Sequence, residues 1–400
     1  MVVKKREKFD MPPHGRYNES AMDIQTQAKN RFIIGLTGNI GTGKSTVMNM
    51  LRHLGAYGVD ADELTKKAYQ IGSISDQIKT RFGDVAVNSH GEVERKALAQ
   101  IVFNDQQALA DLEAILHPQV TRLTQVLVQT ANLPVIVIEA IKLLESDLAA
   151  LCDCIWVVDA DAKTISGRLQ KQRGMNESQI IERLTNQSPP ADKKKKAHII
   201  IENSGNRAET WDQVNRAWQK MMAESENFRK CDQETLALTA PFSARIVTPF
   251  SPAHVHAISA CGPMENAVLI PGGSPLGPDS TEALICDSFV CAEDLKLDAS
   301  SFSVWHLATF SLSMRGWIMQ PGTEDKSDLP STIALAEALA RLQRVESINM
   351  AIPFPFNRDM QGYFMQNAFS RVSDDSPAAA EWHKAGYNVF NKQFWDVTLI

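Results

Sequence analysis

The feature that most constrains this chain is the octapeptide Gly-Asn-Ile-Gly-Thr-Gly-Lys-Ser at residues 38–45, which follows a short apolar run at 32–36. Its glycines permit a tight loop whose backbone N–H groups point inward, and a helix beginning at Lys44 adds its positive N-terminal end. Such a loop cradles nucleotide phosphates, with Lys44 at the β- and γ-phosphates and the Ser45 hydroxyl on Mg²⁺. A purely structural glycine-rich turn is the alternative. The pattern predicts a nucleotide-phosphate site formed by Gly38, Asn39, Ile40, Gly41, Thr42, Gly43, Lys44, Ser45 and Thr46.

Short apolar runs recur along the first half of the chain and are separated by helical patterns. They lie at residues 56–60, 135–139, 155–159 and 198–202, each bounded by turn residues. Val- and Ile-rich runs that alternate with helices are typical of a parallel sheet buried on both faces. We therefore predict an α/β fold of the P-loop NTPase type. Residues 64–127 form a helical insertion in it, and residues 161–190 form a helical lid between the last two strands.

The length of the chain, 400 residues, predicts more than one domain. The polar residues 1–30 are interpreted as a disordered leader, 31–222 as the phosphate-binding domain and 223–242 as a linker. Residues 243–400 are richer in Pro and Gly and are expected to form a C-terminal accessory α+β domain. Asp and Glu outnumber Lys and Arg by 19 to 10 from residue 231 onward, whereas the first 230 residues hold 31 basic and 28 acidic residues. The more basic half suits a polyphosphate ligand better.

Composition excludes several classes of partner. No run of 18 apolar residues is present, so we expect no membrane partner. The six cysteines lack paired CxxC spacing, which is typical of reduced thiols in a cytoplasmic protein. The lysines at 193–196 have no interleaved aromatic residues, and we interpret them as a solvated turn, not a nucleic-acid site. The expected partner is a small molecule, and the oligomeric state is left open.

Acidic residues follow two of the predicted strands. Asp60 and Asp62 stand at the end of the second strand, and Glu139 ends the third. Ligands of such sheets bind at the carboxyl ends of the strands, where a carboxylate can accept a hydroxyl proton or hold Mg²⁺ through water. The alternative for Asp60 and Asp62 is a pair of helix-capping acids, and for Glu139 a strand-end cap.

The order and spacing of several segments resemble those of the dephospho-coenzyme A kinases, through about residue 205. The matching segments are GLTGNIGTGKSTV, DAD at 60–62, GEVERKALAQIVF at 91–103, LEAILHP at 112–118, EAIKLLES at 139–146, ERLTNQ at 182–187 and AHIIIENSG at 197–205. The resemblance implies that the nucleotide-phosphate site at residues 38–46 is an ATP site, and that ATP, with Mg²⁺, phosphorylates the ribose 3′-hydroxyl of dephospho-coenzyme A. Another small-molecule or nucleoside monophosphate kinase, and a non-catalytic nucleotide-sensing regulator, are the alternatives.

The resemblance also implies roles for individual residues. Asp62 matches the base and Asp60 its accompanying acid, and Glu139 matches an acid that holds Mg²⁺. The other matches are Arg95 and His117 in the insertion over the acceptor, Arg168 as a lid arginine at the transferred phosphate, and Asn203 at ATP. The sequence departs from the family at 141–142, where Ile-Lys replaces Pro-Leu, and at Gln172, where a second arginine is usual. Whether Arg173 replaces that arginine, and whether Lys142 reaches a phosphate, stays open.

The second half matches nothing in the kinase pattern. The segments at 244–251, around Trp305 and Ile348, and at 380–399 faintly resemble a GNAT-type acyltransferase. Arg315-Gly316-Trp317 lacks the second glycine of the pyrophosphate loop of such folds. The alternative is an accessory domain that packs on the kinase part or forms an oligomer.

Overall fold

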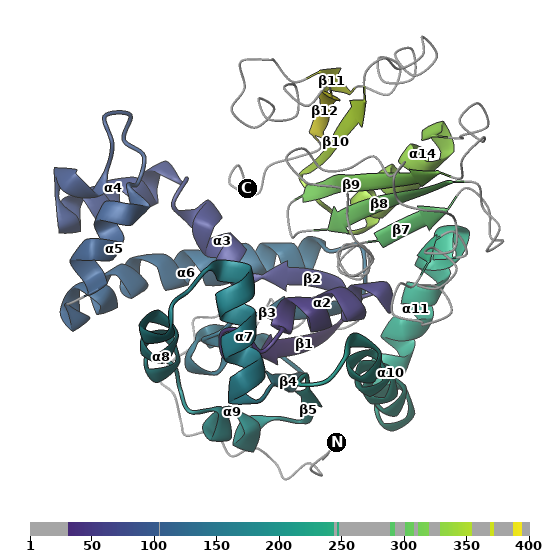
Figure 1. Cartoon of the computed structure of the whole chain (residues 1–400), viewed down its shortest axis with the longest axis horizontal. Coiled ribbons are helices and arrows are strands. Elements are labelled where there is room, and N and C mark those ends of the chain that lie inside the picture. Colours follow the sequence, from purple (N-terminus) through teal and green to yellow (C-terminus); the bar gives the residue numbers. More distant parts are fainter. Residues whose placement is uncertain are drawn as a thin grey trace.

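The computed structural model describes residues 31–103, 105–243, 246–247, 289–292, 301–307, 311–319, 329–353, 369–371 and 387–393. The leader predicted at 1–30 lies outside these residues, as does much of the expected accessory domain. Figure 1 shows the two sheets of the described chain. No helix within the described residues is long and apolar enough to cross a bilayer. The expected cytoplasmic location stays a prediction.

The first sheet is parallel and has the order β2-β3-β1-β4-β5. Its strands are β1 (Phe32–Thr37), β2 (Tyr57–Asp60), β3 (Val135–Glu139), β4 (Cys154–Asp159) and β5 (Ile199–Glu202). These are the five apolar runs seen in the sequence, so the predicted α/β class is confirmed. Residues 38–43 leave β1 between β3 and β4, at the point where successive connections run to opposite sides. Such a switch point is where open parallel sheets bind their ligands.

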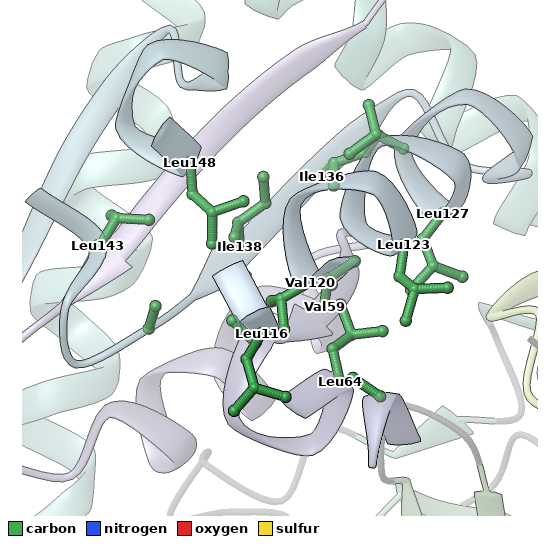
Figure 2. Packing of buried hydrophobic residues seen from close by; sticks show 14 of the residues in the cluster. Val59, Leu64, Leu116, Val120, Leu123, Leu127, Ile136, Ile138, Leu143 and Leu148 are labelled. Carbon is green, nitrogen blue, oxygen red and sulfur yellow. The ribbon is translucent and has the colours of Figure 1, made fainter. Parts of the chain in front are cut away.

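Alternate residues of each strand pack into two separate hydrophobic layers. On one face, Ile136 and Ile138 of β3 meet α3 (Ala61–Ala68) and the long helix α6 (Gln106–Thr130). Figure 2 shows this layer, in which Leu116, Val120, Leu123 and Leu127 of α6 approach β3. On the other face, Val135 and Val137 pack under α2 (Lys44–His53) and α10 (Arg207–Glu224). Burial on both faces explains why the strands read as continuous apolar runs.

The predicted helical insertion between β2 and β3 is confirmed. It contains α3, α4 (Gly72–Phe82), the short 3₁₀ turn η1 (Asp84–Ala86), α5 (Arg95–Phe103) and α6. Figure 1 shows α4 and α5 extending away from the sheet, whereas α6 runs back along it. Two further 3₁₀ turns, η2 (Leu143–Glu145) and η3 (Asp147–Leu151), connect β3 to β4. The insertion therefore forms a lobe beside the carboxyl end of β2.

The segment between β4 and β5 is helical, as predicted for the lid. It consists of α7 (Ala162–Arg173), α8 (Glu177–Thr185) and α9 (Pro190–Lys196). Asp161 caps the start of α7, Gly174 ends it with φ 62°, and Asn176 with Gln179 forms a capping box on α8. A small apolar cluster that includes Ile40 and Leu169 joins the lid to the phosphate loop.

The second sheet has the order β11-β12-β10-β9-β8-β7-β6 and is mixed, because β9 and β10 pair in parallel and the other pairs are antiparallel. Its strands are β6 (Ile246–Val247), β7 (Phe289–Ala292), β8 (Ser301–Leu307), β9 (Ser311–Met319), β10 (Ser347–Pro353), β11 (Ser370–Arg371) and β12 (Tyr387–Gln393). Helix α14 (Leu329–Leu342) precedes β10. The α+β class expected here is confirmed for the described part.

The polar stretch that joins the two halves is helical. It forms α11 (Glu226–Ser243), and Phe228, Cys231 and Thr235 bury their side chains on the first half. The Trp218 indole Nε1 donates to Asp232 Oδ1 over 2.9 Å within this contact. Figure 1 shows α11 running from the first sheet toward the second, which lies on the β2 side. The domain boundaries proposed from the sequence stay predictions.

Candidate active site

The phosphate loop requires glycine at specific positions. Gly38, Gly41 and Gly43 have φ values of 154°, 78° and 91°, a region that residues with a side chain rarely adopt. A Cβ at Gly43 would lie 2.0 Å from Asn203 Nδ2, and one at Gly38 would lie 2.2 Å from a backbone carbonyl oxygen. The glycines thus allow both the turn and the close approach of neighbouring chain.

The start of helix α2 is free to receive an anion. Gly43 provides no side-chain cap, and the first turn carries no acidic residue, so its N–H groups are not neutralised by the protein. Ser45 is exposed at this end. Lys44 is only 7% exposed, and its Nζ donates to the Asn39 carbonyl oxygen over 3.4 Å. Burial lowers the pKa of Lys44, and the negative charges of Glu139, Asp62 and Asp60 oppose that shift.

Three carboxylates stand at the same edge of the sheet as Lys44. Asp60 and Glu139 are partners in the β2–β3 register, and Asp62 follows in the first turn of α3. Asp60 Oδ1 accepts the N–H groups of Asp62 and Glu63 over 2.8 and 3.1 Å, so Asp60 is the helix cap. Asp62 is exposed and available for chemistry. Burial raises the pKa of Glu139 to about 7, which the Lys44 charge opposes and the Asp60 charge reinforces.

Arg168 and Asn203 both donate hydrogen bonds to the backbone of the phosphate loop. Arg168 donates to the carbonyl oxygens of Thr42 over 3.3 Å and of Asn203 over 2.8 Å. The Asn203 amide donates to the same Thr42 oxygen over 2.8 Å, and its Oδ1 accepts the Thr210 hydroxyl. Both side chains are therefore engaged with the loop and its surroundings. The contacts of Arg168 and Asn203 support the conformation of the phosphate loop. The sequence alone did not distinguish this supporting role from direct contact with ATP.

The lid reaches the other side of the loop. The Ile40 N–H donates to Gln187 Oε1 over 2.9 Å, and the Asn39 amide donates to the Ser188 carbonyl oxygen over 3.2 Å. The Ser188 hydroxyl in turn donates to Glu145 Oε1 over 2.5 Å. The loop is thus bonded to the segment between α8 and α9 as well as to Arg168.

Comparisons with known proteins agree with this arrangement. The family model described as dephospho-CoA kinase matches residues 32–209. A dephospho-CoA kinase of Geobacter sulfurreducens is 35% identical over 192 residues, which make up 47% of this chain and 98% of that relative. One of Aquifex aeolicus is 37% identical over 193 residues and is covered to 96%. This chain belongs to the dephospho-CoA kinase family.

Solved structures were compared as well. TT1252 from Thermus thermophilus is 31% identical, with 49% of this chain and 99% of that chain covered, at a TM-score of 0.45. The dephospho-CoA kinase from Campylobacter jejuni is 22% identical, with 48% and 98% covered, at 0.35. The GNAT domain of S. lividans PAT is 10% identical, with 38% and 89% covered, at 0.27. So low a score leaves the GNAT-like fold of the second half a prediction.

Arg173 is the neighbour of Gln172, the position at which other dephospho-CoA kinases usually have a second lid arginine. It is the last residue of α7 and is exposed, and its positive charge lowers the pKa of Lys44. Arg168, by contrast, is engaged with backbone carbonyl groups. Of these two arginines, Arg173 is the exposed one, and it stands at the end of α7 where its charge acts on Lys44.

The two residues expected at the acceptor lie on the helical lobe. Arg95 begins α5, and its guanidinium lies 5.7 Å from the centre of the Tyr69 ring at the end of α3. His117 is exposed on α6, next to Pro118. Their roles at the acceptor stay predictions.

The structure adds information on two lysines. Lys142, whose role the sequence leaves open, pairs with Glu113 Oε1 of α6 over 2.5 Å. The expectation of a solvated turn is wrong for Lys193, which is 2% exposed and donates to the Ile141 carbonyl oxygen over 2.6 Å. Burial lowers the pKa of Lys193, Glu145 opposes the shift, and the nearby Lys44 reinforces it. The run of four lysines hides this position in the sequence, although the i, i+4 spacing to buried Ala197 points to it.

Proposed function

We propose that this chain transfers the γ-phosphoryl group of ATP to the ribose 3′-hydroxyl of dephospho-coenzyme A, giving coenzyme A and ADP. The observation that carries the proposal is the convergence of the phosphate loop, buried Lys44 and three carboxylates at one edge of the sheet. It occurs in a chain that spans nearly the whole length of named dephospho-CoA kinases. Phosphoryl transfer needs in-line positioning and charge stabilisation, and this edge carries charged groups for the second.

Asp62 is the proposed base. Its exposed carboxylate accepts the proton of the 3′-hydroxyl as the oxygen attacks the γ-phosphorus. The bond between that phosphorus and the β–γ bridging oxygen breaks, and ADP leaves with the electron pair. Asp60 fixes the backbone on which Asp62 stands through its two cap hydrogen bonds. Lys44 and the N–H groups at the start of α2 stabilise the charge that develops on the phosphate oxygens.

Ser45 and Glu139 are the proposed holders of Mg²⁺. Both offer oxygen donors, which Mg²⁺ prefers, and they stand at the same end of the sheet. Within the described residues, no group of three or more His, Cys, Asp or Glu could hold a metal alone. This donor set fits an ion that also takes nucleotide oxygens. Bound there, Mg²⁺ would neutralise negative charge on the β- and γ-phosphates.

The lid supplies the remaining proposed contacts. Arg173 would reach the transferred phosphate when α7 and α8 close, while Arg168 and Asn203 keep the loop in its binding conformation. Arg95 and His117 are proposed acceptor contacts on the helical lobe. Lys193 is proposed to hold the Ile141 loop against the site, because α9 reaches that loop through its ammonium group.

A substrate screen with the purified full chain tests the proposal. ADP release is measured with dephospho-coenzyme A, with nucleoside monophosphates and without an acceptor. We expect Lys44→Ala and Asp62→Asn to lower turnover at least about 100-fold, since each removes charge stabilisation or proton transfer. Lys66→Met, on the exposed side of α3, is the matched control and should retain turnover. Preference for another acceptor would favour a different kinase, and ATP binding without turnover would favour a nucleotide sensor.

A further inference from the structure

The turn that follows α14 lies against the kinase sheet where that sheet is open. Strand β2 pairs only with β3, so its outer edge carries backbone groups that no strand satisfies. Residues 341–346, called here the docking turn, reach this edge and the nearby end of α6. Gln343 Nε2 donates to the Ala56 carbonyl oxygen over 3.1 Å, and Asn132 Nδ2 donates to the Arg341 carbonyl oxygen over 2.7 Å.

The backbone of the docking turn is strained at Arg344. With φ 46°, Arg344 is the one non-glycine residue with positive φ in the described part of the chain. The Arg344 N–H donates to the Arg341 carbonyl oxygen, and the Val345 N–H donates to the Ala340 carbonyl oxygen. These bonds close the end of α14, and Arg344 occupies the position that glycine normally takes at such a helix end. An arginine at this strained position is explained by its side chain, because the Arg344 Nη1 donates to the Thr130 carbonyl oxygen over 2.7 Å.

The docking turn also forms an ion pair with α3, the helix that carries the proposed base Asp62. Lys67 Nζ in the last turn of α3 lies 2.5 Å from Glu346 Oε2, with side-chain exposures of 23% and 6%. A carboxylate this buried needs its cation, so the pair constrains both segments more than a surface pair would. The charges of both Arg344 and Glu346 also act on the buried Tyr57 hydroxyl of β2.

The docking turn lies outside residues 32–209, the part of the chain that the dephospho-CoA kinase family model matches. Less than half of this chain covers 98% of the Geobacter relative and 96% of the Aquifex one. The docking turn therefore belongs to what this chain adds. We propose that the docking turn is a positioning element of the kinase, and that Glu346 holds α3 through Lys67 so that Asp62 faces the γ-phosphate. The inference rests on the proposed function, in which Asp62 is the base.

Substitutions in the full chain test this role. Glu346→Gln removes the charge that holds Lys67, and kcat with dephospho-coenzyme A should fall about fivefold or more. The KM for ATP should change less than about twofold, because only the competent fraction of α3 changes and the phosphate loop is untouched. The exchanged pair Lys67→Glu with Glu346→Lys should recover most of the loss. Lys66→Met, exposed on the same helix, should behave as wild type.

A second variant guards against misfolding. Arg344→Gly suits the backbone conformation and removes the side-chain hydrogen bond to Thr130, so it should fold and still lower kcat. Hydrogen exchange of amides 61–68, measured without substrate, should accelerate in both variants. Wild-type kcat and exchange in both would overturn the inference, as would a lower melting temperature with unchanged kcat. A wild-type chain that does not phosphorylate dephospho-coenzyme A refutes the proposed function instead, and the exchange result still decides whether the turn holds α3.

Discussion

Lys193→Met separates a role in turnover from a role in folding. The wild-type ammonium is buried and donates over 2.6 Å to the Ile141 carbonyl oxygen, which also accepts the Thr37 hydroxyl over 3.1 Å. Thr37 ends β1 beside the phosphate loop, and Ile141 follows Glu139 by two residues. A charge-assisted hydrogen bond of this kind contributes about 1.5–3 kcal/mol. If that stabilisation holds the loop for reaction, its loss lowers kcat/KM about 10- to 150-fold.

Methionine keeps the length and the apolar stem of the lysine while it removes the cost of burying a charge. The unfolding free energy should therefore change by no more than about 1 kcal/mol, which urea titration measures. Lys195→Met is the matched control on α9, because Lys195 is exposed and pairs only with Asp192 one turn away. Steady-state ADP release with both substrates varied gives the kinetic result. A Lys193→Met enzyme with kcat/KM within twofold of wild type would refute the reasoning.

Three further outcomes follow from the site and its surroundings. Arg173→Gln should lower kcat about 100-fold with little change in melting temperature, because an exposed lid cation is lost; unchanged turnover would return the role to Arg168. Gly43→Ala should weaken ATP binding and destabilise the fold by about 1–3 kcal/mol. Gly167→Ala should stabilise α7 slightly, because a Cβ there meets nothing within 4 Å. Calorimetry of the two variants measures the difference. Burial lowers the pKa of His53 to about 4, so the unfolded chain binds the extra proton between pH 6.5 and 4 and stability falls as the pH drops. Between pH 7 and 5, the free energy of unfolding measured with urea should fall by about 2 kcal/mol more in wild type than in His53→Gln. An equal fall in both proteins would contradict the lowered pKa.

The parallel sheet and the phosphate loop are predictable because each depends on neighbours in sequence. Residues 135–139 read as a buried strand since both of their faces are covered, and Gly43 reads as a loop glycine since its neighbours complete a known pattern. Asp60 was harder, because a capping acid and a catalytic acid look alike in sequence. The hydrogen bonds from Asp62 and Glu63 assign the cap to Asp60 and leave Asp62 free.

The residues that sequence reasoning missed depend on contacts between distant segments. Lys193 meets Ile141 across 52 residues, and Lys67 meets Glu346 across 279. Only the i, i+4 spacing to Ala197 distinguishes Lys193 from the three lysines beside it, and Arg344 gives no sign in sequence of its positive φ. The exposed position of Arg173, by contrast, could be suspected from the missing arginine at residue 172. Local patterns thus reveal the ATP site, and long-range packing decides what supports it.

The second half is attached to the kinase half at two separated places. Helix α11 packs its buried side chains on the first sheet before it reaches β6, and about a hundred residues later the docking turn binds the edge of β2. Two separated attachments restrict how the described part of the second half can move relative to the first sheet more than a single attachment would. Cutting the chain after α11 would therefore do more than remove a tethered passenger. It would bare the Ala56 and Thr130 carbonyl groups and the Tyr57 ring, leaving an open strand edge of the kind that recruits other chains.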